Sequence, residues 1–364
     1  MIEVLRSGWL GTGPRVARFE QAFAAYVGTS AAIGMSSCTA GLYLALRALG
    51  IVAGDEIITS PVTFPSTVNA IVQLGARPVF ADVLPGWLTL DAEAVHGAVT
   101  PRTRAIVAVH FAGWPCDMEA LAAVRRSGIA VVEDAAHALG ATYRGRHAGA
   151  LGDAASFSFY ATKNITTGEG GMVTTNRADL VPRLRRERLH GIDIDASERA
   201  GATYAHWEAV SEGWKFNLTD IAAALGLEQL AKLPAFLARR RALDASYRAR
   251  LRELPAFEPI GGPPESESAA HLFPVLMRPG ALRIDRDTML KALLAENIGV
   301  GVHFRALPLH RSFRDGLGVD PEAYPVAMDA SQRVFSLPLY PAMTDADQRD
   351  VLEALERISR FYRA

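Results

Sequence analysis

The chain has 364 residues, of which 49% are hydrophobic and 21% are charged. This length is enough for one large hydrophobic core and a smaller second one, because single cores stop growing at roughly 250–300 residues. The formal net charge is -1, and no basic stripe or acidic tail indicates nucleic acid or a membrane surface as a partner. Two cysteines and short apolar runs predict neither a disulfide framework nor a membrane span, and they favour the cytoplasm.

Short apolar runs alternate with helical patterns in the first part of the chain. The runs are apolar on both faces, which suits a sheet that helices cover on both sides. We therefore predict an α/β fold with a doubly wound, mostly parallel sheet, in which ligands bind beyond the carboxyl ends of the strands. The predicted strands are 56–59, 77–80, 104–109 and 129–132, and the predicted helices are 39–49, 67–74 and 118–127.

The pattern changes in the second part of the chain. A helix with Thr219 as its N-cap is predicted first, and an arginine-rich helix follows it. A polar stretch rich in glycine and proline then predicts an exposed connection. We divide the chain into a large α/β domain, residues 1–235, and a smaller C-terminal α+β domain, residues 236–364. The predicted segments are helices 219–230, 236–251 and 285–297, the connection 255–268, and strands 271–277 and 299–304.

Two early segments suit a flat, phosphorylated ligand. Cys38 and Thr39 directly precede the apolar part of a predicted helix, whose free N–H groups and positive dipole end suit a phosphate. Phe64 follows a predicted strand, where an aromatic ring can stack on a flat cofactor. A plain helix cap and a core aromatic are the alternatives, so neither segment decides the function alone.

An apolar strand ends abruptly in two carboxylates, of which Asp134 is the second, and His137 follows. A solvated strand end is one interpretation of Asp134. The other is that Asp134 keeps a pyridine nitrogen protonated, so that a cofactor ring continues to withdraw electrons. His137 then lies beside the ring hydroxyl, whereas a satisfied polar contact is the alternative for this histidine.

Lysine is rare in this chain, with Lys163 one of only four. Arginine replaces lysine as a charge, but it cannot form an imine. Lys163 lies between a β-prone run that contains Ser158 and a glycine-rich loop, in small surroundings that can desolvate an amine. A surface lysine is the alternative. In combination with the earlier segments, Lys163 predicts a Schiff base with pyridoxal 5'-phosphate (PLP), and Ser158 a phosphate contact.

The sequence resembles the DegT-type sugar-nucleotide aminotransferases, which are PLP-dependent enzymes with the aspartate-aminotransferase fold (fold type I). The similarity runs nearly from end to end. It includes Arg6-Ser-Gly-Trp-Leu-Gly-Thr-Gly-Pro14, Ser37-Cys-Thr-Ala-Gly-Leu, Thr63-Phe-Pro-Ser-Thr, Glu133-Asp-Ala-Ala-His, Phe157-Ser-Phe-Tyr-Ala-Thr-Lys-Asn, Gly213-Trp-Lys-Phe-Asn-Leu-Thr-Asp and Ser336-Leu-Pro-Leu-Tyr-Pro. Relatives usually have further residues before the segment that starts here at Met1. A shortened N-terminal segment is therefore one interpretation of this start.

The resemblance implies the role of each candidate residue. Lys163 matches the Schiff-base lysine and general base, Asp134 the partner of the ring nitrogen, and His137 the residue near the ring hydroxyl. The resemblance also implies a homodimer with shared active sites, in which Asn217 reaches the cofactor phosphate of the neighbouring subunit. The remaining matches are Phe64 for stacking on the ring, Cys38, Thr39 and Ser158 for the phosphate, and His303, Phe304 and Arg305 for the substrate.

The implied reaction moves an amino group from an amino acid, by resemblance L-glutamate, to a nucleotide-linked keto sugar. The segment 163–171 is similar to that of relatives that aminate C4 of a 4-keto-6-deoxy or related sugar. Amination at C3 or of an inositol ketone is the alternative within the family. Lys163 argues against the dehydratase branch, which has histidine there.

The sequence argues against two functions outside this chemistry. The intact set of Lys163, Asp134 and His137 argues against a PLP-binding regulator without turnover. Gly11-Thr-Gly13 is the nearest approach to the glycine fingerprint of a nucleotide-binding oxidoreductase, and it lacks a preceding strand and a third glycine. No metal site is predicted.

Overall fold

The computed structural model describes residues 1–124, 128–193 and 206–364. Within these residues the main sheet has seven strands, in the order β1-β9-β8-β5-β4-β2-β3. Neighbouring strands are parallel except at β9, which runs antiparallel to both β8 and β1. The strands are β1 (Ala31–Met35), β2 (Glu56–Thr59), β3 (Arg77–Phe80), β4 (Thr103–Val109), β5 (Ala130–Asp134), β8 (Ala154–Ser158) and β9 (Gly171–Thr175).

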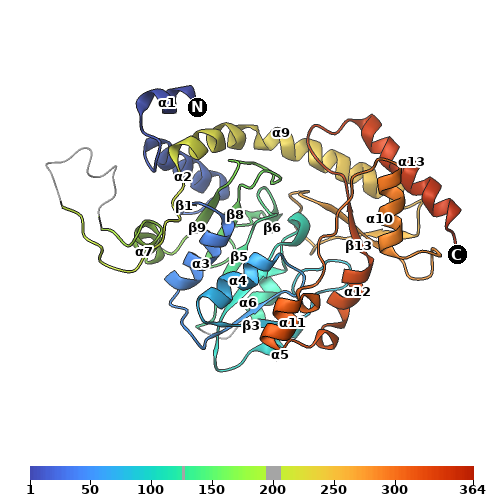
Figure 1. Cartoon of the computed structure of the whole chain (residues 1–364), viewed down its shortest axis with the longest axis horizontal. Coiled ribbons are helices and arrows are strands. Elements are labelled where there is room, and N and C mark those ends of the chain that lie inside the picture. The colour runs from blue at the N-terminus through green and yellow to red at the C-terminus, as the bar shows by residue number, and fades with distance from the viewer. Residues whose placement is uncertain (125–127, 194–205) are drawn as a thin grey trace.

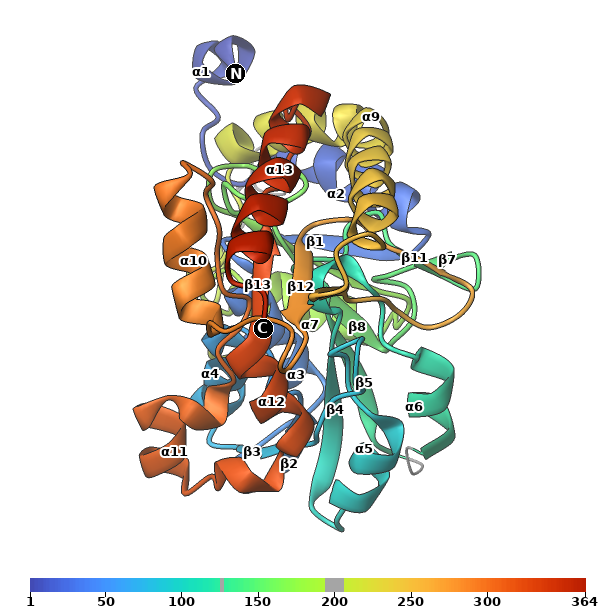
Figure 2. The same cartoon turned by 90° about the vertical axis from the view of Figure 1, so that its right-hand side faces the viewer.

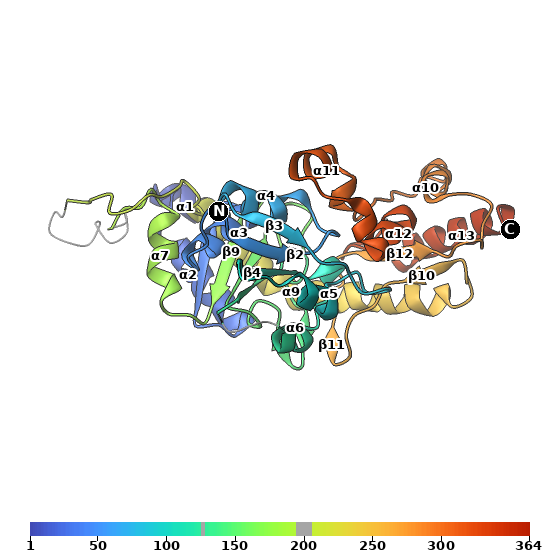
Figure 3. The same cartoon turned by 90° about the horizontal axis from the view of Figure 1, so that it is seen from below.

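Helices cover both faces of this sheet, as Figure 3 shows. Successive strand residues point to opposite faces, so buried Val107 of β4 meets one helix layer and buried Ala108 the other. One layer consists of α3 (Cys38–Ala48), α4 (Pro65–Gln73) and α7 (Leu180–Glu187). The other consists of α2 (Pro14–Val27), α5 (Ala92–Ala98), α6 (Met118–Val124) and the first half of α9 (Asp220–Leu251). The predicted doubly wound, mostly parallel sheet is confirmed.

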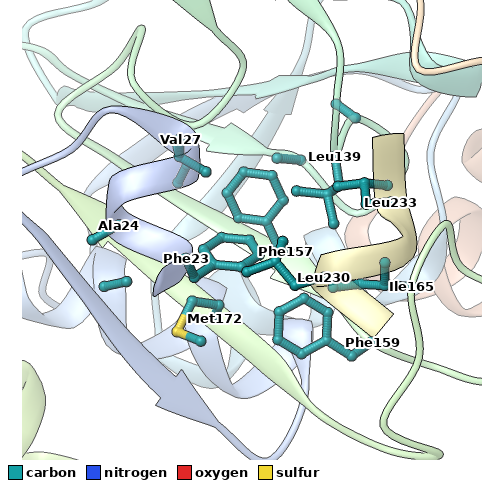
Figure 4. Close-up of a cluster of buried hydrophobic side chains, with 14 of the residues drawn as sticks. Phe23, Ala24, Val27, Leu139, Phe157, Phe159, Ile165, Met172, Leu230 and Leu233 are labelled. Carbon is teal, nitrogen blue, oxygen red and sulfur yellow. The ribbon is translucent and has the colours of Figure 1, made fainter. Parts of the chain in front are cut away.

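The hydrophobic core beneath the lysine-bearing loop lies between α2, β8 and α9 (Figure 4). Phe23 of α2 packs edge-on against Phe157 and Phe159, with ring centroids 5.0 and 5.5 Å apart. Leu230 and Leu233 of α9 belong to the same cluster. This packing fixes the strand segment that leads into Lys163.

Helix α9 corrects one prediction. The two helices expected at 219–230 and 236–251 are one helix of 32 residues, although Pro234 inside it has no N–H to donate. Thr219 is the N-cap, as predicted, and its Oγ1 accepts a hydrogen bond from the N–H of Ala222 at 3.2 Å. The proposed division at residues 235 and 236 therefore lies within a continuous helix.

Helix α9 links the large unit, defined as the seven-stranded sheet with its helices, to a small unit at the C-terminal end (Figure 1). By length and composition alone α9 is apolar enough to cross a membrane. In the structure, however, Leu233 packs in the core of the large unit and Tyr247 in that of the small unit. Membrane crossing is therefore not needed to explain this apolar character.

The small unit is built on a separate sheet, which is antiparallel and has the strand order β10-β12-β13. Figure 2 shows α10 and α13 beside this sheet, with α12 below it. The elements are β10 (Phe257–Pro259), β12 (Phe273–Met277), β13 (Val334–Leu337), α10 (Arg286–Ala295), α11 (Arg311–Leu317), α12 (Pro325–Arg333) and α13 (Asp345–Phe361). Elsewhere, α1 (Ile2–Ser7) begins the chain, and β6 (Thr142–Tyr143), β7 (Arg146–His147) and β11 (Ser266–Glu267) form a small separate sheet.

Two predictions in this unit are wrong. The expected strand 299–304 is absent, because only Gly301 pairs there, in an isolated bridge with Ser336 of β13. The stretch 255–268 is not simply an exposed connection, since it contains β10 and β11 and buries Phe257 and Ile260. The strand predicted at 271–277 and the helix predicted at 285–297 are present as β12 and α10.

Candidate active site

A cavity of about 1180 Å³ lies beyond the carboxyl ends of β5 and β8, and both units contribute to its walls. This volume exceeds the range of roughly 300–1,000 Å³ that is usual for small-molecule sites, so there is room for a cofactor and a large substrate together. Nine of the residues singled out from the sequence line the cavity: Cys38, Thr39, Phe64, Asp134, His137, Ser158, Lys163, His303 and Phe304.

The start of α3 forms one end of the cavity. Ser37 is the N-cap: its side chain accepts from the N–H of Ala40 at 3.1 Å, and its carbonyl accepts from the N–H of Gly41. The N–H groups of Cys38 and Thr39 remain for an anion, which the helix dipole also favours. Gly171 lets β9 pass close by, because a Cβ there would lie 2.5 Å from the carbonyl carbon of Ser37.

Asp134 ends β5 with a side chain that is almost fully buried. Its Oδ2 accepts a hydrogen bond from Oγ1 of Thr67 at 2.7 Å, and its Oδ1 accepts from the N–H of Ala136 at 3.2 Å. Among the described residues, Asp134 has no salt-bridge partner, and its side chain lines the cavity. The carboxylate is thus oriented by neutral donors and can still meet a cationic group of a ligand.

Lys163 lies in the loop that follows β8, where its N–H donates to the carbonyl of Tyr160 at 3.0 Å. Burial lowers the pKa of the Lys163 amine from its ordinary value, while the negative charge of the neighbouring Asp134 opposes this shift. A lowered pKa increases the fraction of neutral amine, which is the form that attacks a carbonyl carbon.

Cys38 contributes a thiol to the same wall. Its Sγ lies 3.5 Å from the carbonyl oxygen of Ser156 and 4.0 Å from Oδ1 of Asp134. Burial and, to a smaller extent, the Asp134 carboxylate raise the pKa of the thiol well above its ordinary value. Cys38 is therefore a neutral group beside Asp134 rather than a nucleophile.

Aromatic rings also line the cavity. Phe304 stacks on His137 with ring centroids 5.8 Å apart and planes 23° apart. Burial, with smaller contributions from the Lys163 and His303 charges, holds the pKa of His137 well below its ordinary value. Phe64, at the start of α4, is 60% exposed and faces the cavity, which leaves its ring free to stack on a ligand.

Two of the predicted residues are placed outside the cavity lining. Asn217 donates from Nδ2 to Oγ1 of Thr12 at 2.8 Å, within the same chain. Arg305 is exposed, and its Nη2 donates to the carbonyl of Leu309. The site of one chain therefore brings together the other nine residues and neither of these two.

Several lining or supporting residues were not predicted from the sequence. Thr67 of α4 donates a hydrogen bond to Asp134. The buried residues Asn164 and His271, which are 107 positions apart in the sequence, contact each other. Arg239 of α9 and Tyr340, which follows β13, also line the cavity. Local patterns carry little signal for such residues, because their partners are distant in the sequence.

These residues fit PLP. The free N–H groups at the start of α3 suit its phosphate, the exposed face of Phe64 suits its ring, and the buried Asp134 carboxylate suits its protonated nitrogen. The desolvated Lys163 amine lines the same cavity and suits its aldehyde.

Comparisons with known proteins agree with this chemistry. The model of the DegT/DnrJ/EryC1/StrS aminotransferase family matches residues 1–356. The chain is 44% identical over 359 residues to the spore coat polysaccharide biosynthesis protein SpsC of Bacillus subtilis, which covers 98% of this chain and 92% of SpsC.

Solved structures are also similar. Spr1654 of Streptococcus pneumoniae, in its PLP form, has a TM-score of 0.91 and 30% identity, over 99% of this chain and 95% of that one. The sugar aminotransferase CalS13 of Micromonospora echinospora has a TM-score of 0.87 and 33% identity, over 97% and 94% of the two chains. The chain therefore belongs to the DegT/DnrJ/EryC1/StrS aminotransferase family and is a PLP-dependent sugar aminotransferase of fold type I.

Proposed function

We propose that this enzyme transfers the amino group of L-glutamate to a nucleotide-linked keto sugar, at C4 of a 4-keto-6-deoxy or related sugar. The observation that carries the proposal is the desolvated Lys163 amine, which shares one large cavity with the buried Asp134 carboxylate. The similarity of segment 163–171 to that of C4-aminating relatives supports the choice of carbon.

When bound, PLP supplies an electron-withdrawing ring that stabilises negative charge at the carbon losing a proton. Asp134 maintains this property by holding the ring nitrogen protonated. Lys163 would hold the cofactor through its amine. Once an amino acid takes that place, the free Nζ of Lys163 would accept the proton from the amino acid's Cα and return it to the cofactor. The same lysine moves the proton in the opposite sense when the keto sugar is aminated.

The remaining residues bind and orient. We assign the phosphate to the N–H groups of Cys38 and Thr39 and to Ser158, and ring stacking to Phe64. His303, whose Nδ1 lies 2.9 Å from Oγ of Ser336, and Phe304 are proposed to contact the sugar. Arg305 is assigned to the same substrate region, at the exposed end of this segment.

A homodimer with shared active sites is part of the proposal. Helix α1 lies against α9, and exposed apolar residues on both, including Ile2, Leu5 and Leu225, suit burial against a second copy. In that dimer we assign Asn217 to the cofactor phosphate of the neighbouring subunit. A cytoplasmic location is also proposed, which the buried free thiols of Cys38 and Cys116 support.

The first test is the absorption spectrum of the purified protein after reconstitution with PLP. We expect a band of the lysine-bound cofactor that excess L-glutamate converts to the spectrum of pyridoxamine phosphate. Lys163→Ala should lack the band, whereas Lys232→Ala, on the exposed part of α9, should retain it. A wild type without the band would contradict the cofactor site, and a band that glutamate leaves unchanged would contradict the proposed donor.

The position of amination needs a separate test. Candidate nucleotide-linked 4-keto and 3-keto sugars are incubated with glutamate and enzyme, and the amino sugar is analysed by NMR. We expect the new C–N bond at C4. Turnover of only the 3-keto sugars, or of an inositol ketone, would overturn the C4 assignment and leave the aminotransferase in place.

A further inference from the structure

Asn164 directly follows the cofactor lysine, and its amide is nearly completely buried. Nδ2 donates hydrogen bonds to the carbonyls of Leu139 at 3.2 Å and Ala269 at 3.0 Å. A flipped amide would place its oxygen against both of these oxygens, so the orientation of the amide is determined. Oδ1 consequently points to the ring of His271.

This orientation determines the protonation of His271. Its Nδ1 lies 3.0 Å from Oδ1 of Asn164, and an amide oxygen can only accept, so Nδ1 carries the proton. Burial, followed by the charges of His137, Lys163, Arg240 and His303, holds the pKa of His271 well below its ordinary value. His271 is therefore a neutral imidazole with its lone pair on Nε2.

The backbone of His271 is fixed as well. Nη1 of the buried Arg240 donates to the carbonyls of Ala270 at 3.2 Å and His271 at 3.1 Å. The ring itself packs against His137, with centroids 4.5 Å apart and planes 34° apart. The ring of His137 thus contacts the rings of both His271 and Phe304.

We propose that Asn164 and His271 are a positioning pair for the active site. Asn164 locks His271 in the Nδ1–H form, and His271 in turn holds the ring of His137 at the cavity wall. The pair also connects the loop of Lys163 to the segment that leads into β12. This connection holds the catalytic and cofactor-binding groups of the two units in a fixed position relative to one another. The role of His137 rests on the proposed function, whereas the tautomer of His271 is a property of the chain alone.

The tautomer is measured by NMR on PLP-reconstituted protein with ¹⁵N-labelled histidine, and the His271 signals are those that disappear in His271→Phe. We expect a protonated Nδ1 and an unprotonated Nε2 at neutral pH. A proton on Nε2, or on both nitrogens, would overturn the proposal whether or not the protein transfers amino groups.

The consequence for catalysis is measured with two variants. His271→Phe keeps a flat ring against His137, whereas His271→Ala removes it. We expect His271→Ala to lower kcat about 10-fold or more with little change in KM, and His271→Phe to recover most of the loss, because misplacement of a supporting group mainly affects the reacting geometry. Equal kcat values for both variants and the wild type would overturn the proposal.

Loss of stability alone must be distinguished from loss of position. Gln348→Ala is a matched control, since Gln348 is a buried amide that donates to the carbonyl of Leu243 at 2.8 Å within the small unit. We expect this variant to unfold more easily and to keep the kcat of the wild type. A wild type that does not transaminate any keto sugar would contradict the proposed function, and the NMR result would still decide the tautomer.

Discussion

At the residue scale, Lys163 and the nearby Asp134 carboxylate are coupled by charge. Burial lowers the pKa of Lys163, and the negative charge of Asp134 limits that shift. Asp134 is itself oriented by neutral donors, from Thr67 and Ala136, so its charge stays available to the cavity. The sequence predicted both residues but not Thr67, because a threonine in a helix 67 positions away carries no local signal.

This coupling predicts a pH dependence in the apo protein. An amine-specific reagent labels only the neutral amine, so labelling of Lys163 should increase with pH through a midpoint below the ordinary lysine value of about 10.4. In Asp134→Asn the opposing charge is removed, and the midpoint should move to still lower pH. Mass spectrometry of the labelled peptide measures both curves.

Glu169→Gln is the control for this prediction. Glu169 lines the same cavity but is not among the charges that act on Lys163, so its removal should leave the midpoint unchanged. A midpoint that rises in Asp134→Asn, or that moves equally in Glu169→Gln, would show that the carboxylate of Asp134 does not act on this amine.

At the element scale, the end of the cavity that is proposed to bind the cofactor phosphate depends on how closely α3 packs on the sheet. Gly41 of α3 faces β8 and β9, and a Cβ there would lie 2.3 Å from Oγ of Ser156 and 3.0 Å from Cγ2 of Val173. Gly41 therefore determines how closely α3 approaches the sheet. It thereby sets the position of the N-terminal end of α3, which lies one turn before Gly41, relative to Asp134 and Ser158.

Gly41→Ala should consequently destabilise the apo protein by about 1–3 kcal/mol, the usual effect of overpacking a core. It should also weaken PLP binding, because α3 is displaced. Gly97→Ala in α5 is the control, since no atom lies within 4 Å of its Cβ, and we expect it to be neutral or to stabilise by about 0.5–1 kcal/mol. Urea unfolding and PLP titration measure these effects; a Gly41→Ala protein as stable as the wild type would contradict the packing argument.

The elements also show where sequence patterns suffice. The strands β2 to β5 are apolar on both faces, and their runs alone predicted them. The segment 299–304 has a similar β-prone pattern, but its pairing stops after Gly301, and His303 and Phe304 line the cavity instead. Two helices were predicted where α9 is one, and packing of Leu233 and Leu237 against the large unit keeps the helix continuous past Pro234.

At the scale of the whole molecule, the cavity depends on contacts that join distant parts of the chain. Asn164 reaches His271, and Arg240 reaches the carbonyl of Leu339, so that the large and small units form a common wall. Residue types at a strand end predicted the cofactor site, whereas this wall was not predictable, because it depends on how the two units pack. The proposed dimer adds a further level, at which Asn217 acts outside its own chain.

Subunit complementation tests whether Asn217 acts in the active site of the neighbouring subunit. Lys163→Ala and Asn217→Ala are each expected to lower activity, and their mixed dimer should contain one intact site, built from Lys163 of one chain and Asn217 of the other. Random reassembly after mild denaturation should therefore restore about a quarter of wild-type activity, since half of the dimers are mixed and each has one of two sites. Light scattering should give twice the chain mass of 39.1 kDa.

The matched control mixes Lys163→Ala with Asp134→Asn. Both residues line the cavity of their own chain, so neither site of this mixed dimer is intact, and no activity should return. If the pair with Asn217→Ala also stays inactive, Asn217 serves its own chain, in agreement with its bond to Thr12 but not with a shared site. Recovery in the first mixture alone would establish that each active site is completed by the neighbouring subunit.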